Sequence, residues 1–497
     1  MNIDIFLHLI ILLPVLGAIA LFFGLPARKT SLAVSIAGLV LTAFTIAGYL
    51  QTEGGFQFRS SLPIVAEWNL NYSLGVDGLS LAMTLLATIV TVAAVWSTPK
   101  IEKNEPLFYA CLLFISAGSI GAFLSLDLFF FYIFHELALI PTFLLIGIWG
   151  SGEKQAAAWQ ITIYLALGSI VLLVGLIGVY LAVPPDLRTF DIPTLHALAE
   201  SNVFRPARWI FPTLLVGFGI LVSLFPFHTW APKAYASAPA PAAMLHAGVL
   251  KKFGLYGLLR IGIPLFPLGI QSWDWIILIL LIGNILFVGL ATIHQKQLDT
   301  LLGYSSVMHM GYIYLGIVSM NAIGFNGAAL LIFAHGLSIA ALFATAGFLR
   351  EKTGTLELSD LGGLGKRTPV LMFCFGLAAF ASIGLPGFGN FAAEILVFFG
   401  AFSSGFEANA FVSGRFNFHQ IATFIGLWGV VISAVYMLRA YRKIFMGDLL
   451  PRWENLTDIA GTYKIPLLLL LGVLLFIGLV PQSFLNLVGP TLLNLLP

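Results

Sequence analysis

The sequence predicts an all-α, polytopic membrane protein with about 14 transmembrane helices. Of its 497 residues, 59% are hydrophobic and only 9% are charged, whereas roughly a quarter of the residues in an average soluble domain are charged. Apolar runs such as 165–183 and 276–292 approach the roughly 20 residues with which a helix crosses a bilayer, and they lack the alternation of barrel strands. This composition excludes a soluble enzyme, and a net charge of +2 excludes a nucleic-acid binder.

Apolar segments follow one another along the whole chain, and no strand is expected between them. The candidate spans are 3–23, 31–50, 74–97, 107–125, 128–148, 160–183, 208–236, 240–263, 275–293, 299–319, 324–349, 369–404, 419–445 and 464–484. The first lacks a basic leader and a small-residue cleavage site, so we expect a retained helix. Most Lys and Arg residues of the loops fall on one side of this topology, so the positive-inside rule places both termini outside a bacterial inner (plasma) membrane.

Two of the spans are interrupted by proline. Pro226 interrupts the seventh span and Pro386 interrupts the twelfth, where it stands between two glycines in the stretch GLPG. Paired interruptions in corresponding places of two halves indicate internal repeats and point to a transport pathway. We therefore expect one membrane domain over 1–497 that contains two inverted five-helix repeats, each with a broken helix. The two repeats are expected over 107–263 and 275–445.

Few ionisable residues lie inside the predicted spans, and each is a candidate member of that pathway. A charge at the bilayer centre costs from about 2.5 to more than 10 kcal/mol, so such residues pair with one another or face water inside the protein. Acids and amines held there can bind and release a proton when a neighbouring group gains or loses its charge. Histidine titrates near neutrality. The candidates are Glu136, Lys251, Lys252, Glu394, His309 and His335, with His246 the weakest; His8, His196, His294 and His419 lie near span ends or in loops.

The two adjacent lysines cannot play the same role on a regular helix. Lys251 and Lys252 would project about 100° apart, so at most one points squarely along an internal axis.

No cofactor is expected in this chain, because it has no Gly-rich phosphate loop and no dinucleotide fingerprint. Its two cysteines, Cys111 and Cys374, lie within apolar runs and suit neither a disulfide framework nor a metal site. The chain can move protons or ions, but a partner or an ion gradient must supply the energy.

Short motifs along the chain resemble those of one family. They are LGVDGLS at 74–80, FHE at 134–136 followed by Pro141, FPFHTW at 225–230, AGVLKK at 247–252 with YGLLR at 256–260, YSS and HMG within 304–311, and GLPG at 384–387 with Asn390, Phe391 and Glu394. Over essentially the full chain, these motifs are similar to those of the M-type antiporter-like membrane subunits of respiratory complex I. Glu394 favours the M-type over the L-type relative, which typically has lysine at this position.

The resemblance implies a proton-translocating subunit of an NADH- or ferredoxin-driven quinone oxidoreductase, a translocase without redox chemistry of its own. Glu136, Lys252 and Glu394 would occupy the fifth-, eighth- and twelfth-helix positions of the proton path, with His309 and His335 linking its two half-channels. FMN, iron–sulfur clusters and quinone would belong to partner subunits. The expected partners are the L-type and N-type antiporter-like subunits, small membrane subunits of the complex, and lipids.

Three departures from the family pattern concern the partner of Glu136. The family usually has a lysine five residues before the proline of the broken seventh helix, where this chain has Leu221. Lys233 stands where the family has an acid, and Lys251 is an added cation beside the expected Lys252. Our hypothesis is that Lys251, or else Lys233, replaces the missing partner.

Two alternative functions remain open from the sequence. One is a subunit of an Mrp-type cation/proton antiporter or of a membrane-bound hydrogenase, against which only the M-type motifs argue. The other is a structural subunit that has lost pumping, which Leu221 suggests.

Overall fold

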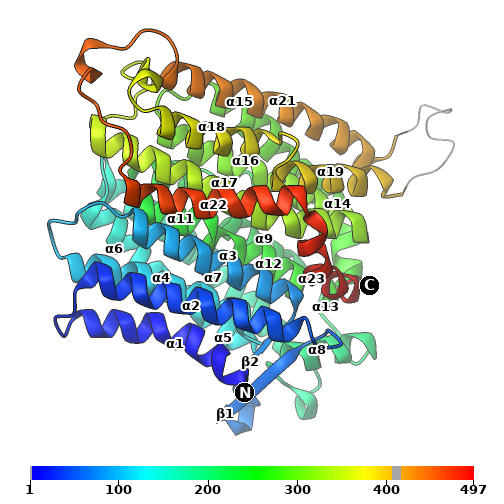
Figure 1. Cartoon of the computed structure of the whole chain (residues 1–497). Coiled ribbons are helices and arrows are strands. Elements are labelled where there is room, and N and C mark those ends of the chain that lie inside the picture. The colour runs from blue at the N-terminus through cyan, green and yellow to red at the C-terminus, as the bar shows by residue number, and fades with distance from the viewer. Residues whose placement is uncertain (1–2, 406–415, 497) are drawn as a thin grey trace.

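The computed structural model describes residues 3–405 and 416–496. In this part of the chain, long helices lie side by side and run roughly along one direction (Figure 1). Eleven of the described spans are long and apolar enough to cross a membrane. They are α1 (Asp4–Leu21), α2 (Ala27–Tyr49), α3 (Gly78–Ser97), α4 (Glu105–Leu124), α5 with α6 (Leu128–Leu137, Leu139–Trp149), α7 (Lys154–Leu181), α14 with α15 (Pro267–Ile282, Gly289–Ile293), α16 (Leu298–Val318), α17 (Ala322–Thr353), α21 (Phe418–Phe445) and α22 (Gly461–Leu479).

The other three predicted spans are built from shorter pieces. They comprise α9 and α10 (Ile210–Val222, Trp230–Ser237), the run α11, α12 and α13 (Ala240–Gly248, Phe253–Gly257, Ile263–Leu265), and α18 and α19 (Pro369–Ile383, Gly389–Ser403). Two further short helices lie outside the predicted spans or at their ends, α8 (Ile192–Glu200) and α23 (Pro481–Asn494). The all-α polytopic fold is confirmed, whereas the count of fourteen spans stays a prediction.

The bundle has buried and peripheral helices. The most apolar windows of α3, α16 and α17 are 94%, 94% and 100% buried, whereas those of α2 and α22 are only 28% and 33% buried. The exposed faces of the peripheral helices are themselves apolar, as lipid-facing surfaces are. Two proton-path candidates of the second half, His309 and His335, therefore lie on α16 and α17, two of the most buried of these helices, whereas Glu394 lies on α19.

Both proline interruptions break their helices as expected. α9 ends at Ser223 in the left-handed conformation, and α18 ends at Gly384 with φ +85°. Proline cannot donate a backbone hydrogen bond and fixes φ, so neither helix continues through it. At the first break Asn284 replaces the missing partners: its side-chain oxygen accepts from the Phe225 N–H at 2.6 Å, and its amide donates to the Ser223 carbonyl at 3.2 Å.

The expectation that no strand occurs is wrong. β1 (Gln57–Val65) and β2 (Leu70–Val76) form an antiparallel hairpin between α2 and α3, at the end of the bundle where N and C are marked (Figure 1). The segment carries polar and apolar residues without a clean alternation and is too short to compete with the helical signal around it. The hairpin leads directly into the N-cap of α3, Asp77, whose side chain accepts from the Ser80 N–H.

The eighth span is also irregular, whereas the sequence predicts a regular helix at Lys251 and Lys252. The chain leaves α11 at Val249 and passes through a 3₁₀ turn, Leu250–Lys252, before α12. A π-helical turn, Leu258–Gly262, follows α12. Because 3₁₀ turns have three residues per turn, the side chains of Lys251 and Lys252 diverge by about 120°.

Candidate functional site

Both lysines of the eighth span are enclosed by protein, with side chains that reach different parts of α16. Lys251 is 1% exposed and Lys252 is 0% exposed. The ammonium nitrogen of Lys251 lies 3.5 Å from the Ser306 hydroxyl, and that of Lys252 lies 3.9 Å from the Met310 sulfur. An amine whose neighbours are a hydroxyl and a thioether has little to stabilise a fixed charge, as a proton carrier requires.

Two histidines continue from Ser306 toward the second helix break. The Ser306 hydroxyl lies 3.3 Å from Nε2 of His335, and the ring of His335 stacks on that of His309 with centroids 5.1 Å apart. Nδ1 of His309 lies 2.7 Å from the Ser305 carbonyl oxygen, and its Nε2 lies 2.9 Å from the Ser382 carbonyl oxygen. A neutral imidazole donates from one nitrogen only, so both carbonyls are satisfied together when the ring is doubly protonated.

Glu394 lies on the other side of this break. It is 4% exposed, and its carboxylate packs so closely on Gly384, at the end of α18, that a side chain there would collide with it. Within the described residues, Oε1 of Glu394 and the hydroxyl of Tyr312 are both buried without a hydrogen-bond partner. The carbonyl that His309 contacts belongs to Ser382, two residues before Gly384, so His309 and Glu394 both contact the end of α18 at the break.

Glu136 lies apart from this buried chain. Its side chain on α5 is 31% exposed and lies 3.8 Å from Nδ1 of His135, beside the hydroxyls of Tyr132 and Ser169. His135 is buried, and its ring stacks on Phe253, next to Lys252 in sequence, with centroids 4.1 Å apart. Of the ion pairs within 4.0 Å in the described part of the chain, the one that Glu136 makes is with His135.

The hypothesis on the missing lysine partner stays a prediction. Lys233 is exposed on α10 and makes no ion pair within 4.0 Å in residues 3–405 and 416–496. Leu221, at the family's lysine position, is 2% exposed and packs with Ile220 against Gly168 of α7. The position is thus an apolar contact between helices.

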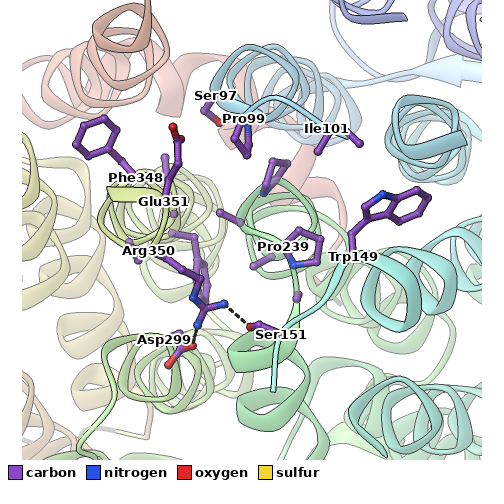
Figure 2. A pocket seen from close by; sticks show the side chains of 18 of the residues that line it. Ser97, Pro99, Ile101, Trp149, Ser151, Pro239, Asp299, Phe348, Arg350 and Glu351 are labelled. Atoms are coloured by element: carbon purple, nitrogen blue, oxygen red, sulfur yellow. Dashed lines mark hydrogen bonds and ion pairs between the residues drawn. The ribbon is translucent and has the colours of Figure 1, made fainter. Parts of the chain in front are cut away.

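A cavity of about 500 Å³ opens at the end of the bundle opposite the hairpin (Figure 2). Its walls come from the ends of α3, α10, α11, α17 and α22 and from the loops at 99–103 and 149–151. Arg350 forms an ion pair with Asp299 and donates to the Ser151 hydroxyl at 2.7 Å (Figure 2). Lys100, Lys103 and Arg350 border the cavity.

A buried ion pair lies at the opposite end. Arg260 lies 2.6 Å from the Asp77 carboxylate, and both side chains are almost fully buried. The adjacent Gly78 N–H donates to the Thr491 hydroxyl at 3.0 Å, and Nε2 of His196 lies 2.8 Å from the Arg260 carbonyl oxygen. This pair connects α3, α8, α23 and the π-helical turn, so we assign it to stability and not to transport.

Sequence reasoning missed several residues of this site. Asp77 and Arg260 belonged to recognised motifs, but their pairing requires the fold. No sequence signal singled out His135 or the tyrosines Tyr312 and Tyr436, because buried aromatic residues are common in membrane helices. The hydroxyl of Tyr436 on α21 lies 2.8 Å from the Ser305 hydroxyl. No group of three or more His, Cys, Asp or Glu residues suited to a metal ion occurs in the described ranges.

Comparison with known proteins identifies the family. Residues 125–416 match the family model described as "NADH:quinone oxidoreductase/Mrp antiporter, TM". The chain is 35% identical over 434 residues to NAD(P)H-quinone oxidoreductase chain 4-2 of Synechocystis sp., covering 87% of this chain and 76% of that protein. It is 29% identical to NADH-quinone oxidoreductase subunit M of Rickettsia prowazekii, covering 100% of this chain and 98% of that protein.

A solved structure agrees with the sequence relatives. A chain of respiratory complex I from Thermus thermophilus with bound NADH superposes with a TM-score of 0.87 at 27% identity, and the match covers 100% of both chains. The fold, the family model and the relatives therefore point the same way: this chain belongs to the NADH:quinone oxidoreductase/Mrp antiporter transmembrane family, among the relatives named chain 4 or subunit M.

Proposed function

We propose that this chain is a proton-translocating, antiporter-like subunit of a complex I-type NADH:quinone oxidoreductase. The observation that carries the proposal is a series of buried polar groups. Lys251 contacts Ser306, Ser306 contacts His335, and His335 stacks on His309. His309 and Glu394 each contact the backbone at the second helix break. Each of these groups can hold or pass a proton, and their side chains are all buried. The matching relatives, which are named as subunits of quinone oxidoreductases, support this function.

The mechanism we propose is a relay between positions that are costly to charge. Lys252 and Glu394 are the two terminal carriers of the central axis, and a proton leaving the lysine side reaches Glu394 through His335 and His309. Burial disfavours the charged amine and the charged carboxylate alike. A change in the charge of one carrier therefore shifts the protonation equilibrium of the next carrier. Glu136, with His135 beside it, is the acid through which neighbouring subunits influence the lysines.

The two ends of the bundle suggest its orientation in the membrane. We propose that the cavity bordered by Arg350 and Asp299 faces the inner side of a bacterial plasma membrane and that both termini lie outside. The two broken helices then belong to the two inverted five-helix repeats, 107–263 and 275–445. Their half-helix ends and freed backbone groups provide polar surroundings at membrane depth, as in other transporters with paired breaks.

The energy for transport would come from partner subunits. We propose that FMN, iron–sulfur clusters and quinone are bound there, and that this chain contacts L-type and N-type antiporter-like subunits, small membrane subunits and lipids. Its own residues hold and move protons only. The enzyme activity therefore belongs to the assembled NADH- or ferredoxin-driven quinone oxidoreductase.

One observation favours a second candidate function, a structural subunit that does not pump. Leu221 replaces the family's lysine, and Glu136 has a histidine and no lysine within 4.0 Å in the described residues. A module without that pair would lose the link between Glu136 and the central axis. The Mrp-type alternative shares the family model, but the relatives named above favour the quinone oxidoreductase.

Protons pumped per electron, measured in proteoliposomes of the purified complex, test the proposal. Lys252→Met should lower this ratio, because an apolar side chain cannot take up a proton. Lys296→Met, on an exposed loop lysine, is the matched control and should leave the ratio unchanged. If Lys252→Met and Glu136→Gln both leave the ratio unchanged in fully assembled complexes, the structural alternative holds and the proposal fails.

A further inference from the structure

The cavity at the inner end reaches a tyrosine that contacts the buried chain. Tyr235, near the end of α10, is 2% exposed and forms part of the cavity wall. Its hydroxyl lies 3.2 Å from Nδ1 of His246 on α11, and the two rings pack with centroids 5.6 Å apart. A hydroxyl and an imidazole in hydrogen-bond contact can exchange a proton, so Tyr235 on the cavity wall and His246 next to it form a pair that can carry a proton.

Lys251 lies directly behind this pair. Its ammonium nitrogen is 5.8 Å from the centre of the Tyr235 ring, and the same nitrogen is 3.5 Å from the Ser306 hydroxyl. Ser306 in turn contacts Nε2 of His335. Lys251 thus stands between the cavity wall and the histidines of the central axis.

Lys252 does not occupy this place, although it is adjacent. The 3₁₀ turn directs its side chain to Met310, about one helical turn along α16 from Ser306. In the 3₁₀ turn each lysine has its own contact on α16, Lys251 with Ser306 and Lys252 with Met310. The irregular backbone therefore has a consequence for both side chains.

We propose that Tyr235, His246 and Lys251 form a proton-uptake branch that connects the inner cavity to the central axis at His335. The inference rests on the proposed function and assigns to Lys251 a role other than pairing with Glu136. A proton from water in the cavity replaces the one that the Tyr235 hydroxyl gives to Nδ1 of His246, and the protonated ring supplies the neutral amine of Lys251. The resulting ammonium gives a proton to the Ser306 oxygen as the Ser306 O–H proton passes to Nε2 of His335, which restores the amine.

Two substitutions test the branch in the purified, assembled complex. Lys251→Leu removes the amine, and Tyr235→Phe removes one oxygen atom from the cavity wall. Both should lower the protons pumped per electron, and Tyr235→Phe also serves where Lys251→Leu does not assemble. The matched controls are Lys296→Leu on an exposed loop and Tyr314→Phe, a buried tyrosine of α16 whose hydroxyl has no hydrogen-bond partner in the described residues.

A third variant separates proton transfer from a purely electrostatic role. Lys251→Arg keeps the positive charge, but a guanidinium does not give up its proton. The branch predicts that Lys251→Arg lowers the ratio as Lys251→Leu does. A wild-type ratio in Lys251→Arg, together with a lowered ratio in Lys251→Leu, overturns the relay role.

Blocking the cavity tests the same branch without changing its carriers. Ser97 lies on the cavity wall, and both native cysteines are buried. In Ser97→Cys, a charged thiol reagent that does not cross membranes should lower the ratio after labelling, whereas labelling an exposed Ser201→Cys should not. An unchanged ratio in labelled Ser97→Cys overturns the cavity as the entrance.

The outcomes distinguish this inference from the proposed function. If Lys252→Met lowers the ratio while Lys251→Leu and Tyr235→Phe do not, the branch is wrong and the proposed function stands. If none of the three changes the ratio in assembled complexes, the proposed function fails and the branch fails with it.

Discussion

Nε2 of His309 lies 2.9 Å from the carbonyl oxygen of Ser382, a backbone group in the last turn of the helix that breaks at Gly384. Because Nδ1 of the same ring lies 2.7 Å from the Ser305 carbonyl, the ring is held between two acceptors. The broken helix thus takes part in binding His309. It supplies one of the two hydrogen-bond acceptors that fit a histidine carrying an extra proton.

The first prediction concerns this histidine. His309→Gln keeps one amide donor for a carbonyl but cannot carry a proton, so transfer through this module should slow on the order of a hundredfold. The number of protons pumped per electron should fall by the number that this subunit contributes, while the complex stays assembled. A wild-type ratio would show that protons bypass His309.

The second prediction uses two glycines of the same break. Gly384→Ala and Gly387→Ala both place a side chain at positive φ, +85° and +100°, which costs about 1–2 kcal/mol. A Cβ on Gly384 would collide with the Glu394 carboxylate, whereas one on Gly387 meets nothing within 4 Å. Pumping should therefore fall in Gly384→Ala and stay near wild type in Gly387→Ala. Equal pumping in both variants would contradict a role for the contact with Glu394.

The third prediction concerns the buried ion pair at the other end. Arg260→Ala leaves the Asp77 carboxylate buried without its partner and should destabilise the protein by about 3–5 kcal/mol. Arg205→Ala, at an exposed arginine, is the control and should stay within about 0.5 kcal/mol of wild type. Thermal unfolding of the detergent-solubilised complex measures both, and similar midpoints would show that the pair is not needed.

The fourth prediction concerns pH and the N-cap of α5. Burial raises the pKa of the Asp127 carboxyl to about 6, and the nearby Asp191 carboxylate adds to this, against three backbone N–H donors that lower it. Since this folded-state pKa lies above the unfolded value of about 3.9, the group's stabilisation is present below pH 3.9 and lost as pH rises through 6.

Asparagine caps helices about as well as aspartate but does not ionise. Asp127→Asn should therefore match wild type near pH 4 and exceed its stability at pH 7.5, by up to about 3 kcal/mol. Melting midpoints of the complex at several pH values measure the difference. A constant difference across this range would contradict the raised pKa.

Composition and proline positions were sufficient to predict much of this fold. Pro226 and Pro386 mark the two broken helices, because proline ends a helix by a local mechanism. The few ionisable residues in the spans are the predicted pathway residues, because a charge inside a bilayer is costly unless it is paired or faces water. Lys252, His309, His335 and Glu394 are all found buried, although their roles stay proposals.

The remaining features depend on packing between distant segments. Just before the 3₁₀ turn at Leu250–Lys252, α11 approaches α17 closely: a Cβ on Gly336 of α17 would lie 2.7 Å from the Gly248 carbonyl oxygen. No local sequence signal reports such a close approach. The same holds for Tyr235 and His246: Tyr235 lines the cavity, and its hydroxyl contacts the ring of His246, the weakest histidine candidate.

The most direct test of the central claim is the number of protons pumped per electron by assembled complexes that carry Glu394→Gln, compared with Glu394→Asp and wild type. Glutamine matches glutamate in size but cannot take up a proton, whereas aspartate can. The account predicts a lowered ratio for Glu394→Gln and substantial recovery in Glu394→Asp. A wild-type ratio in Glu394→Gln would contradict the claim that this buried chain carries protons.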